Sequence, residues 1–315
     1  MKRELVALIG GLLIAMTVVP AFYVISTTSK AAPSSTSPGR IKVVATFYTV
    51  YDFAHNVGGD RIDLLLLVPE TEDVHSFDPR PSSIQAVATA NVLIFSGAGL
   101  ETWVPQIVAA ANNPRLVVVD SSQGIPLLQV SPRFQKGNRT MDPHIWLDPI
   151  LAKQQVMNIL QGLNGADPAD QAYFTSNAQT YAARLDSLNS QIANTTRNVK
   201  TRYFVTLHEA FAYFANRYNL TQVPIAGPFE EEPTPRDIQT AIGVVQQNHL
   251  CYVGYESLEN PSLSQSIASQ THATIVVLDP IEGLSQADQV AGKTYLIKMQ
   301  DNLANFVLVL NHADC

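Results

Sequence analysis

The feature that most constrains this fold is an alternation, from Ile41 onward, between short runs rich in β-branched residues and stretches with helical periodicity. Such alternation is typical of βαβ units, whose strands form largely parallel sheets. Eight of the runs are predicted to be strands, and they form two groups of four. The first group is 41–47, 61–68, 91–97 and 115–120, and the second is 202–208, 222–227, 251–257 and 273–279. The predicted helices are 81–89, 100–111, 210–218, 234–248 and 262–270.

A long helical segment, 166–199, separates the two groups of strands. Its apolar and aromatic residues recur near helical spacing, and it contains no Gly or Pro after Pro168. Asp167 before Pro168 is typical of a helix start, with an N-cap followed by proline at the first helical position. About 30 residues at about 1.5 Å each give a helix of about 45 Å, long enough to cross the whole molecule. The sequence therefore predicts two α/β lobes joined by one stiff helix, with a helix–loop–helix broken near Asn177 as the alternative.

The amino-terminal segment has the pattern of an export signal, because an apolar run at 5–25 follows Lys2 and Arg3. A run of about 21 residues is also just long enough to span a bilayer, so cleavage and retention as a membrane anchor both remain open. The segment that follows is rich in Ser, Thr, Pro and Ala and is typical of a flexible linker. The predicted organisation is a signal peptide or anchor at 1–25, a linker at 26–40, an amino-terminal lobe at 41–165, the linking helix at 166–199 and a carboxyl-terminal lobe at 200–315.

The formal net charge of −7 indicates which kinds of partner the chain can bind. A negative surface disfavours nucleic acid, whose phosphates need basic patches, and it is compatible with cations. With 46% hydrophobic residues in 315, the chain can bury a substantial core, which excludes a disordered protein.

The two cysteines, Cys251 and Cys315, bear on compartment and anchoring. An even number of cysteines in an exported chain makes a disulfide between them reasonable in an oxidising compartment. No cysteine precedes Cys251, so a lipid-modified cysteine just after the apolar run cannot be the anchor. If the protein stays on the membrane, its own apolar segment must hold it.

Three of the seven histidines stand out by their context in the sequence. His208 ends a predicted strand, His75 lies in a loop a few residues past the strand 61–68, and His144 lies in a loop bounded by prolines. Asp279 ends another predicted strand. Ligands of open α/β sheets bind at the carboxyl ends of strands, so these four side chains can converge in one cleft. Three imidazoles and one carboxylate complete a four-coordinate site for a borderline-soft ion such as Zn²⁺.

Each of these residues also has an ordinary structural interpretation. A histidine in a loop is often only a surface residue, and Asp279 before Pro280 can simply begin a turn. The ordinary interpretation is kept for the remaining histidines: His55, His249, His272 and His312.

The alternative function from another class is a zinc hydrolase, with Glu209 or Glu256 as the general base beside a metal-bound water. Catalytic zinc sites keep one coordination position open, and four protein ligands leave none. We therefore expect a binding protein and not an enzyme. A surface adhesin is a further alternative, without a distinct sequence feature of its own.

Four segments, taken in order, resemble the periplasmic or cell-surface metal-binding proteins of ABC transporters for zinc and manganese. They are EDVHSFDPRPSSIQAVATANVLIFSGAGLETW, DPHIWLDP, LHEAFAYFANRYNL and IVVLDPIEGL. In that family the ligands are the histidines of the first three segments and the acidic residue of the fourth, which correspond here to His75, His144, His208 and Asp279. The resemblance implies two lobes bridged by one long helix, a metal site in the cleft between them, and delivery of the ion to an ABC permease. It also implies a location outside the cytoplasm, and we expect a monomer.

The ligand types favour zinc, and manganese or iron remains the alternative. Nitrogen-rich sites bind Mn²⁺ weakly, whereas manganese-specific relatives tend to have Glu at the position of His208. One departure from zinc members is that 132–141 contains neither His nor Asp, so the chain lacks the metal-scavenging loop that many of them carry.

Polar residues close to these histidines have roles that the sequence leaves open. Asp142 and Asp148 flank His144, and either can orient its second ring nitrogen or serve as a cap or turn residue. The acidic run 227–233 is predicted to be a solvated loop, because three consecutive carboxylates cannot all face one ion.

Overall fold

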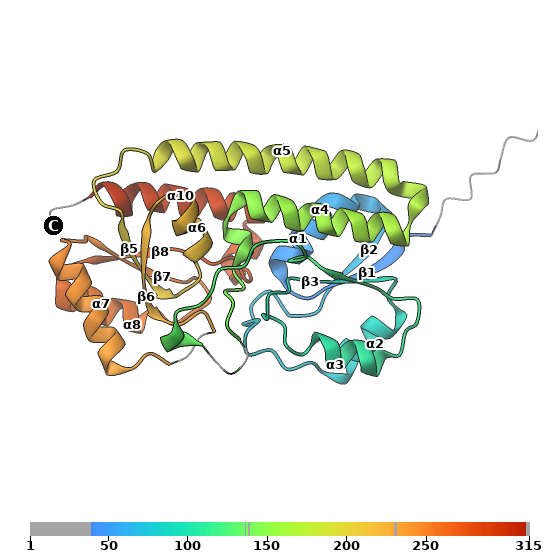
Figure 1. The fold of residues 1–315 in the computed structure, drawn as a ribbon, viewed down its shortest axis with the longest axis horizontal. Helices are drawn as coiled ribbons and strands as arrows, with labels where there is room; N and C mark the ends of the chain where they lie inside the picture. The colour runs from blue at the N-terminus through green and yellow to red at the C-terminus, as the bar shows by residue number, and fades with distance from the viewer. Residues whose placement is uncertain (1–38, 136, 138, 230–231, 313–315) are drawn as a thin grey trace, which may run out of the picture. The chain divides into compact units, whose positions relative to one another are not determined.

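The computed structural model describes residues 39–312 except 136, 138, 230 and 231. The predicted signal or anchor, nearly all of the predicted linker, and Cys315 therefore lie outside the described residues. Within the part that is described, none of the helices combines the length and apolar character needed to cross a bilayer. The unit 39–315 contains two α/β lobes with parallel strands and a long helix along both of them, as the sequence predicts (Figure 1).

The amino-terminal lobe is a four-stranded parallel sheet between two layers of helices. Its strand order is β2-β1-β3-β4. The strands are β1 (Ile41–Ala45), β2 (Ile62–Leu66), β3 (Val92–Phe95) and β4 (Val117–Asp120), and the helices are α1 (Tyr48–Gly58), α2 (Pro81–Thr89) and α3 (Val104–Ala111). Figure 1 shows α1 and α4 (Pro149–Ala166) on one side of the sheet and α2 and α3 on the other. Burial on both faces explains why the central strand β3 is a continuous apolar run.

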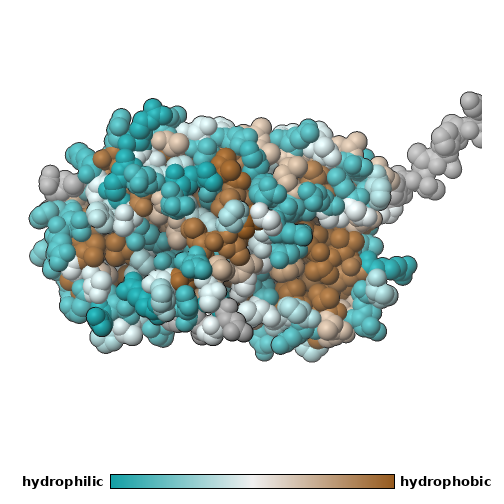
Figure 2. Space-filling view, in the orientation of Figure 1, coloured by the Kyte–Doolittle hydropathy of each residue, from teal (hydrophilic) through white to brown (hydrophobic). Residues whose placement is uncertain are grey.

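One row of side chains shows how far α2 and α3 cover their face of this sheet. The strand register aligns Leu65, Val44, Leu93 and Val118 across the four strands. The two central side chains are buried, whereas Leu65 and Val118 at the edges are 49% and 44% exposed. Figure 2 shows apolar residues gathered on the amino-terminal lobe in this view. The helices thus protect the centre of the sheet and leave its edges open.

The carboxyl-terminal lobe contains two parallel strand pairs. Their members are β5 (Tyr203–His208) with β6 (Thr221–Ala226), and β7 (Tyr252–Tyr255) with β8 (Thr274–Val277). The strands β5 and β7 lie side by side, and a Cβ at Gly254 would approach the Val205 carbonyl oxygen to 2.7 Å, so this position requires glycine. The helices of this lobe are α6 (Ala212–Arg217), α7 (Pro235–Gln247), α8 (Ser262–Thr271), α9 (Gln286–Val290) and α10 (Tyr295–Asn311).

The long helix is α5 (Gln171–Thr195), and it continues unbroken through Asn177. The predicted N-cap, Asp167, accepts a hydrogen bond from the Ala169 amide and begins a short 3₁₀ turn that leads into α5. The buried residues of α5 recur every three or four positions, which gives one apolar stripe. They are Phe174, Ala178, Tyr181, Leu185, Leu188 and Ile192. Through this stripe α5 packs on α1 and α4 in one lobe and on α10 in the other.

All eight predicted strands are present, with ends shifted by up to two residues, whereas α1, α4, α9 and α10 are not among the predicted helices. The α1 sequence is rich in aromatic and β-branched residues, which have low intrinsic helix propensity. Its helix is stabilised by tertiary packing of the buried face, including Val50, Phe53 and Val57. In α4, Asp148 accepts hydrogen bonds from the Ile150 and Leu151 amides, so this residue is the helix cap.

Candidate metal centre

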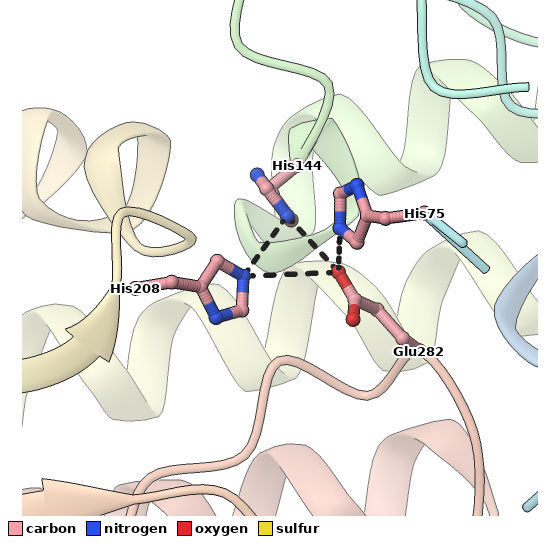
Figure 3. A group of neighbouring side chains, drawn as sticks. All are labelled: His75, His144, His208 and Glu282. Carbon is pink, nitrogen blue, oxygen red and sulfur yellow. Dashed lines mark hydrogen bonds and ion pairs between the residues drawn. The ribbon is translucent and has the colours of Figure 1, made fainter. Parts of the chain in front are cut away.

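Four side chains from four separate segments converge between the lobes, and we call them the donor cluster: His75, His144, His208 and Glu282 (Figure 3). One ligand atom from each lies within 4.8 Å of all the others. Their side chains are only 2%, 0%, 3% and 5% exposed. The protein therefore places three imidazoles and one carboxylate around a single buried point.

The spacing of these atoms matches what a small tetrahedral ion needs. Glu282 Oε1 lies 2.9 Å from His75 Nε2, 3.0 Å from His144 Nε2 and 3.9 Å from His208 Nε2. The Nε2 atoms of His144 and His208 are 3.3 Å apart. Around a zinc ion with bonds of about 2.0–2.1 Å, tetrahedral ligand atoms are about 3.3–3.4 Å from one another. Small displacements of these side chains would therefore accommodate the ion.

The segments that carry the donors are held by backbone and side-chain hydrogen bonds. His208 is the last residue of β5, at the carboxyl end of its sheet. His144 precedes the 3₁₀ turn Ile145–Leu147, which leads into α4. The Trp146 indole in that turn is fully buried and donates to the Pro280 carbonyl oxygen at 2.6 Å. This bond joins the segment that carries His144 to the one that carries Glu282.

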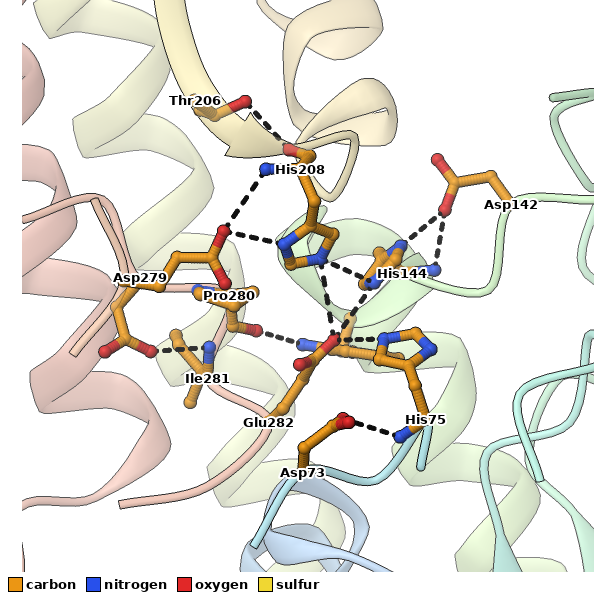
Figure 4. A network of polar contacts seen from close by, with 12 residues as sticks. Asp73, His75, Asp142, His144, Thr206, His208, Asp279, Pro280, Ile281 and Glu282 are labelled. Atoms are coloured by element: carbon orange, nitrogen blue, oxygen red, sulfur yellow. Dashed lines mark hydrogen bonds and ion pairs between the residues drawn. The ribbon is translucent and has the colours of Figure 1, made fainter. Parts of the chain in front are cut away.

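Two of the three imidazoles are oriented by carboxylates. His144 Nδ1 lies 2.8 Å from Asp142 Oδ1, and His208 Nδ1 lies 2.6 Å from Glu256 Oε1 (Asp142 and both histidines are labelled in Figure 4). A carboxylate at Nδ1 fixes the tautomer that leaves Nε2 for a metal and raises the basicity of the ring. Asp142 thus takes the orienting role that the sequence left open, and Glu256 is the corresponding partner of His208.

His75 is held differently. Its backbone amide donates to Asp73 Oδ1 at 2.7 Å, and the Ser76 amide donates to Asp73 Oδ2 at 3.1 Å, so Asp73 shapes the loop as in an Asx turn. Its ring nitrogen Nδ1 is buried without a hydrogen-bond partner among the described residues. His75 is therefore fixed mainly through its backbone.

The surrounding charges determine the protonation of the donor cluster without an ion. Burial opposes the charged form of His144, but hydrogen bonds to Asp142 and Glu282 outweigh it and raise the pKa to about 9. Burial likewise opposes the charged form of His208, and Glu256 raises its pKa to about 9. Burial disfavours the ionised Glu282, yet the neighbouring histidines, beginning with His75, hold its pKa well below the ordinary value. At neutral pH protons thus supply the positive charge that a cation can replace.

Asp279, the predicted acidic ligand, does not lie in the donor cluster, and Glu282 lies there in its place. Asp279 Oδ2 accepts a hydrogen bond from Lys298 Nζ at 2.7 Å and contacts the Ser257 hydroxyl. Lys298 is only 3% exposed and needs buried counter-charges, which Asp279 and Asp288 provide. We call these three residues the lysine cluster. The segment IVVLDPIEGL contains both acidic residues, and both the strand-end position and the family resemblance selected the first of them.

The turn between the two acidic residues contains an unusual backbone conformation. Ile281 has φ of 61°, a left-handed conformation that is strained for a β-branched residue. Its amide donates to Asp279 Oδ1 at 2.7 Å, and its carbonyl oxygen accepts from the Thr49 hydroxyl (Asp279 and Ile281 in Figure 4). Asp279 therefore stabilises the turn that presents Glu282.

The hydrolase alternative needs Glu209 or Glu256 as a general base beside a metal-bound water. Neither residue has the surroundings of such a base. Glu256 is bonded to His208 Nδ1, so it orients an imidazole. Burial, and after it the charge of Asp142, raises the pKa of Glu209 to about 7. With four donors already around the central point, neither carboxylate faces an open coordination position.

The chain is similar over most of its length to zinc-uptake proteins. The family model described as "Zinc-uptake complex component A periplasmic" (ZnuA) matches residues 43–308. The chain is 30% identical over 285 residues to the high-affinity zinc uptake system protein ZnuA of Bacillus subtilis (strain 168), a match that covers 87% of this chain and 89% of that protein. It is 28% identical over 275 residues to the zinc-binding lipoprotein AdcA of Streptococcus pneumoniae R6, covering 84% of this chain but only 55% of that longer protein. The solved structure of the Zn(II)-bound ZnuA-like domain of Streptococcus pneumoniae AdcA matches with a TM-score of 0.76 and 28% identity, covering 87% of this chain and all of that one.

Proposed function

This chain belongs to the ZnuA family of periplasmic zinc-uptake components, and we propose that it captures one Zn²⁺ outside the cytoplasm and delivers it to an ABC permease. The family is one of solute-binding proteins and not of enzymes. The two relatives above are named for zinc uptake and zinc binding, and the similar solved structure is Zn(II)-bound. The ion is cargo here, because it is bound for transfer and not for chemistry.

The proposed ligands are the Nε2 atoms of His75, His144 and His208 and a carboxylate oxygen of Glu282. The observation that carries this assignment is the mutual distance of at most 4.8 Å between these four atoms. Imidazole nitrogens with one carboxylate suit Zn²⁺, which needs neutral histidines and accepts four-coordinate geometry. Asp279 is not proposed as a ligand, because its carboxylate is bonded to Lys298 and to the Ile281 amide.

Zinc is favoured over manganese or iron by the chemistry of the donors. Mn²⁺ stands lowest in the Irving–Williams order for nitrogen sites, and His208 gives this cluster its third imidazole. The carboxylates of Asp142 and Glu256 contact the rings of His144 and His208. Through these rings the two carboxylates stabilise a doubly charged ion.

We also propose the organisation around this site. The two lobes, at 41–165 and 200–315, act as the two walls of the metal site, with 166–199 as the rigid link. The protein acts as a monomer, and 1–25 directs export and is either removed or kept as a membrane anchor.

A disulfide between Cys251 and Cys315 is a further part of the proposal. Cys251 is buried just before β7, and the rings of Tyr252 and His312 lie with centroids 6.0 Å apart. The end of α10 is thus already beside β7, three residues before Cys315. Titration of free thiols in the unreduced, denatured protein should find none, and two thiols per chain would contradict the bond.

The experiment that tests the function is a zinc titration of residues 41–315 and of single-ligand variants. The parent should bind one equivalent, and His208→Ala should bind far more weakly while remaining folded. His249→Asn is a matched control, because His249 is exposed and its φ of 48° is tolerated by Asn. Equal affinity in all three proteins would place the site elsewhere. Hydrolysis of model esters by the zinc-loaded parent would favour the enzyme.

A further inference from the structure

The donor cluster is buried, so an ion needs a path to reach it. We propose that a hydrated divalent cation enters through a cavity of about 390 Å³ at the carboxyl ends of β5, β6 and β7, guided by Glu232 and Glu259 at its mouth. This inference rests on the proposed function and adds its route of entry. It assigns a role to Glu232, which belongs to the acidic run 227–233 and lies outside the donor cluster.

The cavity reaches the site directly. Its wall contains His208, a proposed ligand, and Glu256, which bonds the other nitrogen of the same ring. A second, smaller cavity of about 20 Å³ is lined by Glu282 and Asp73 and shares Glu256 and Glu259 with the first. The two cavities therefore form a continuous series of wall residues from the mouth to two of the four ligands.

The charge of this wall attracts cations. Glu232 and Glu259 are exposed at the mouth, Glu256 is buried further in, and no Lys or Arg is present among the described residues that line the two cavities. Burial, and then the charges of the nearby Glu256 and Asp73, raise the pKa of Glu259. A cleft lined by one sign of charge concentrates counter-ions and speeds their association.

One feature of the mouth opposes a cation, and the structure reduces its effect. The first residue of α8, Ser262, lies in the cavity wall, and a helix N-terminus carries partial positive charge. The Ser262 amide donates to Asn260 Oδ1 at 3.0 Å, so one of the exposed donors is already satisfied. The wall's one imidazole, His208, is paired with Glu256, so the carboxylates of Glu232 and Glu259 remain to attract a cation.

Two further cavities in the described part of the chain are less suited to this role. One of about 240 Å³ has Arg133 in its wall, and one of about 300 Å³ has Lys293 and Lys298. Neither is lined by any member of the donor cluster. Of these four cavities, the one beside His208 combines space, negative charge and contact with a proposed ligand.

The route is tested by the kinetics of zinc exchange in 41–315, followed by stopped-flow competition with a fluorescent chelator. Ser262→Trp places a large side chain over the cavity at an exposed position, and Gln265→Trp, one turn along α8 and outside the cavity wall, is the matched control. A blocked path slows association and dissociation by the same factor and leaves the equilibrium affinity unchanged. We expect this result for Ser262→Trp, and parent rates for Gln265→Trp.

The charge of the mouth is tested with the double variant Glu232→Gln/Glu259→Gln. Its association rate should fall about threefold or more at low ionic strength and approach the parent rate in high salt. Asp63→Asn/Asp186→Asn removes the same charge far from the mouth and should leave the rate unchanged. Parent kinetics in both Ser262→Trp and the glutamate double variant would overturn the route while leaving zinc binding intact. A parent protein that binds no zinc would instead overturn the proposed function.

Discussion

Two buried charged clusters lie on either side of the turn at Pro280 and Ile281, and they balance charge in different ways. In the lysine cluster, Asp279 and Asp288 pair with the ammonium group of Lys298. In the donor cluster, Glu282 is neutralised by histidines, whose protons can leave. A fixed cation stabilises a fold, whereas a removable proton makes room for a metal ion. The comparison explains why Glu282, and not Asp279, faces the centre of the site.

The largest effect should come from removing the carboxylate of the donor cluster. Glu282→Gln keeps the side-chain shape but removes the only negative donor, so zinc affinity should fall by at least about 100-fold, the upper range for losing even an outer partner of a ligand. Competition titration against a chelator of known affinity measures this. Asp279→Asn is the matched change on the other side of the turn, and its zinc affinity should stay within about tenfold of the parent. A reversal of these two results would make Asp279 the ligand.

The next prediction concerns the free energy of unfolding. Here Asp279→Asn should have the larger effect of the two variants, and Glu282→Gln the smaller. Asp279→Asn leaves Lys298 buried with Asp288 as its remaining carboxylate, and it weakens support for the strained Ile281 turn. Removing one partner of a buried ion pair lowers the free energy of unfolding by about 3–5 kcal/mol. Because Asp288 still pairs with Lys298, we expect a loss of about 3 kcal/mol. Denaturant unfolding of the metal-free proteins measures it. A cost below about 1 kcal/mol would show that the lysine cluster does not stabilise the fold.

The two clusters should also respond differently to pH. The pKa values of His144 and His208 are raised to about 9 in the folded protein, so their contribution to stability is complete below about pH 6.5 and is lost as the pH rises through 9. Burial disfavours the ionised Asp288, but hydrogen bonds, beginning with the one to Lys298, outweigh it and lower the pKa of Asp288, so the contribution of this carboxylate to stability is lost as the pH falls. Thermal unfolding of the metal-free protein should therefore occur at lower temperature at pH 9 than at pH 6.5.

Zinc affinity should change with pH in the opposite direction. Zinc binds neutral imidazole, so each histidine that is protonated in the free protein must release its proton on binding. With two such histidines, affinity should rise by up to about 100-fold per pH unit below pH 9. Competition titrations at several pH values measure the slope. A flat profile would mean that His144 and His208 are already neutral without metal.

The sequence predicted the fold well because its signals are local and repeated. β-branched runs marked the eight strands, and a stripe of apolar residues without Gly or Pro marked α5. The helices that were missed have weak local signals: α1 contains several aromatic and β-branched residues, and it is helical because its buried face packs against the sheet and α5. Such packing depends on distant segments, which a local pattern does not contain.

The candidate site was predicted in the same way, and its difference from the structure has the same cause. His75, His144 and His208 were selected by their place in loops or at a strand end, and the structure brings them together. Asp279 was selected by the same rule, but its orientation depends on Lys298, nineteen residues later in the chain. Glu282 follows a left-handed residue, and the sequence gives no local signal that Ile281 adopts that conformation.

The smallest expected effect concerns the choice of metal. The parent should bind zinc more tightly than manganese, because three imidazoles and one carboxylate suit a tetrahedral Zn²⁺ and Mn²⁺ stands lowest in the Irving–Williams order. His208→Glu adds a second carboxylate and should shift the ratio of affinities toward Mn²⁺ by about tenfold, although Glu256 beside it will repel the new charge. A His208→Glu/Glu256→Gln variant removes that repulsion and should shift the ratio further. Competition titration of both metals at one fixed pH measures it, since ligand protonation changes affinity. Tighter binding of manganese by the parent would show that the geometry of the donor cluster outweighs its ligand types.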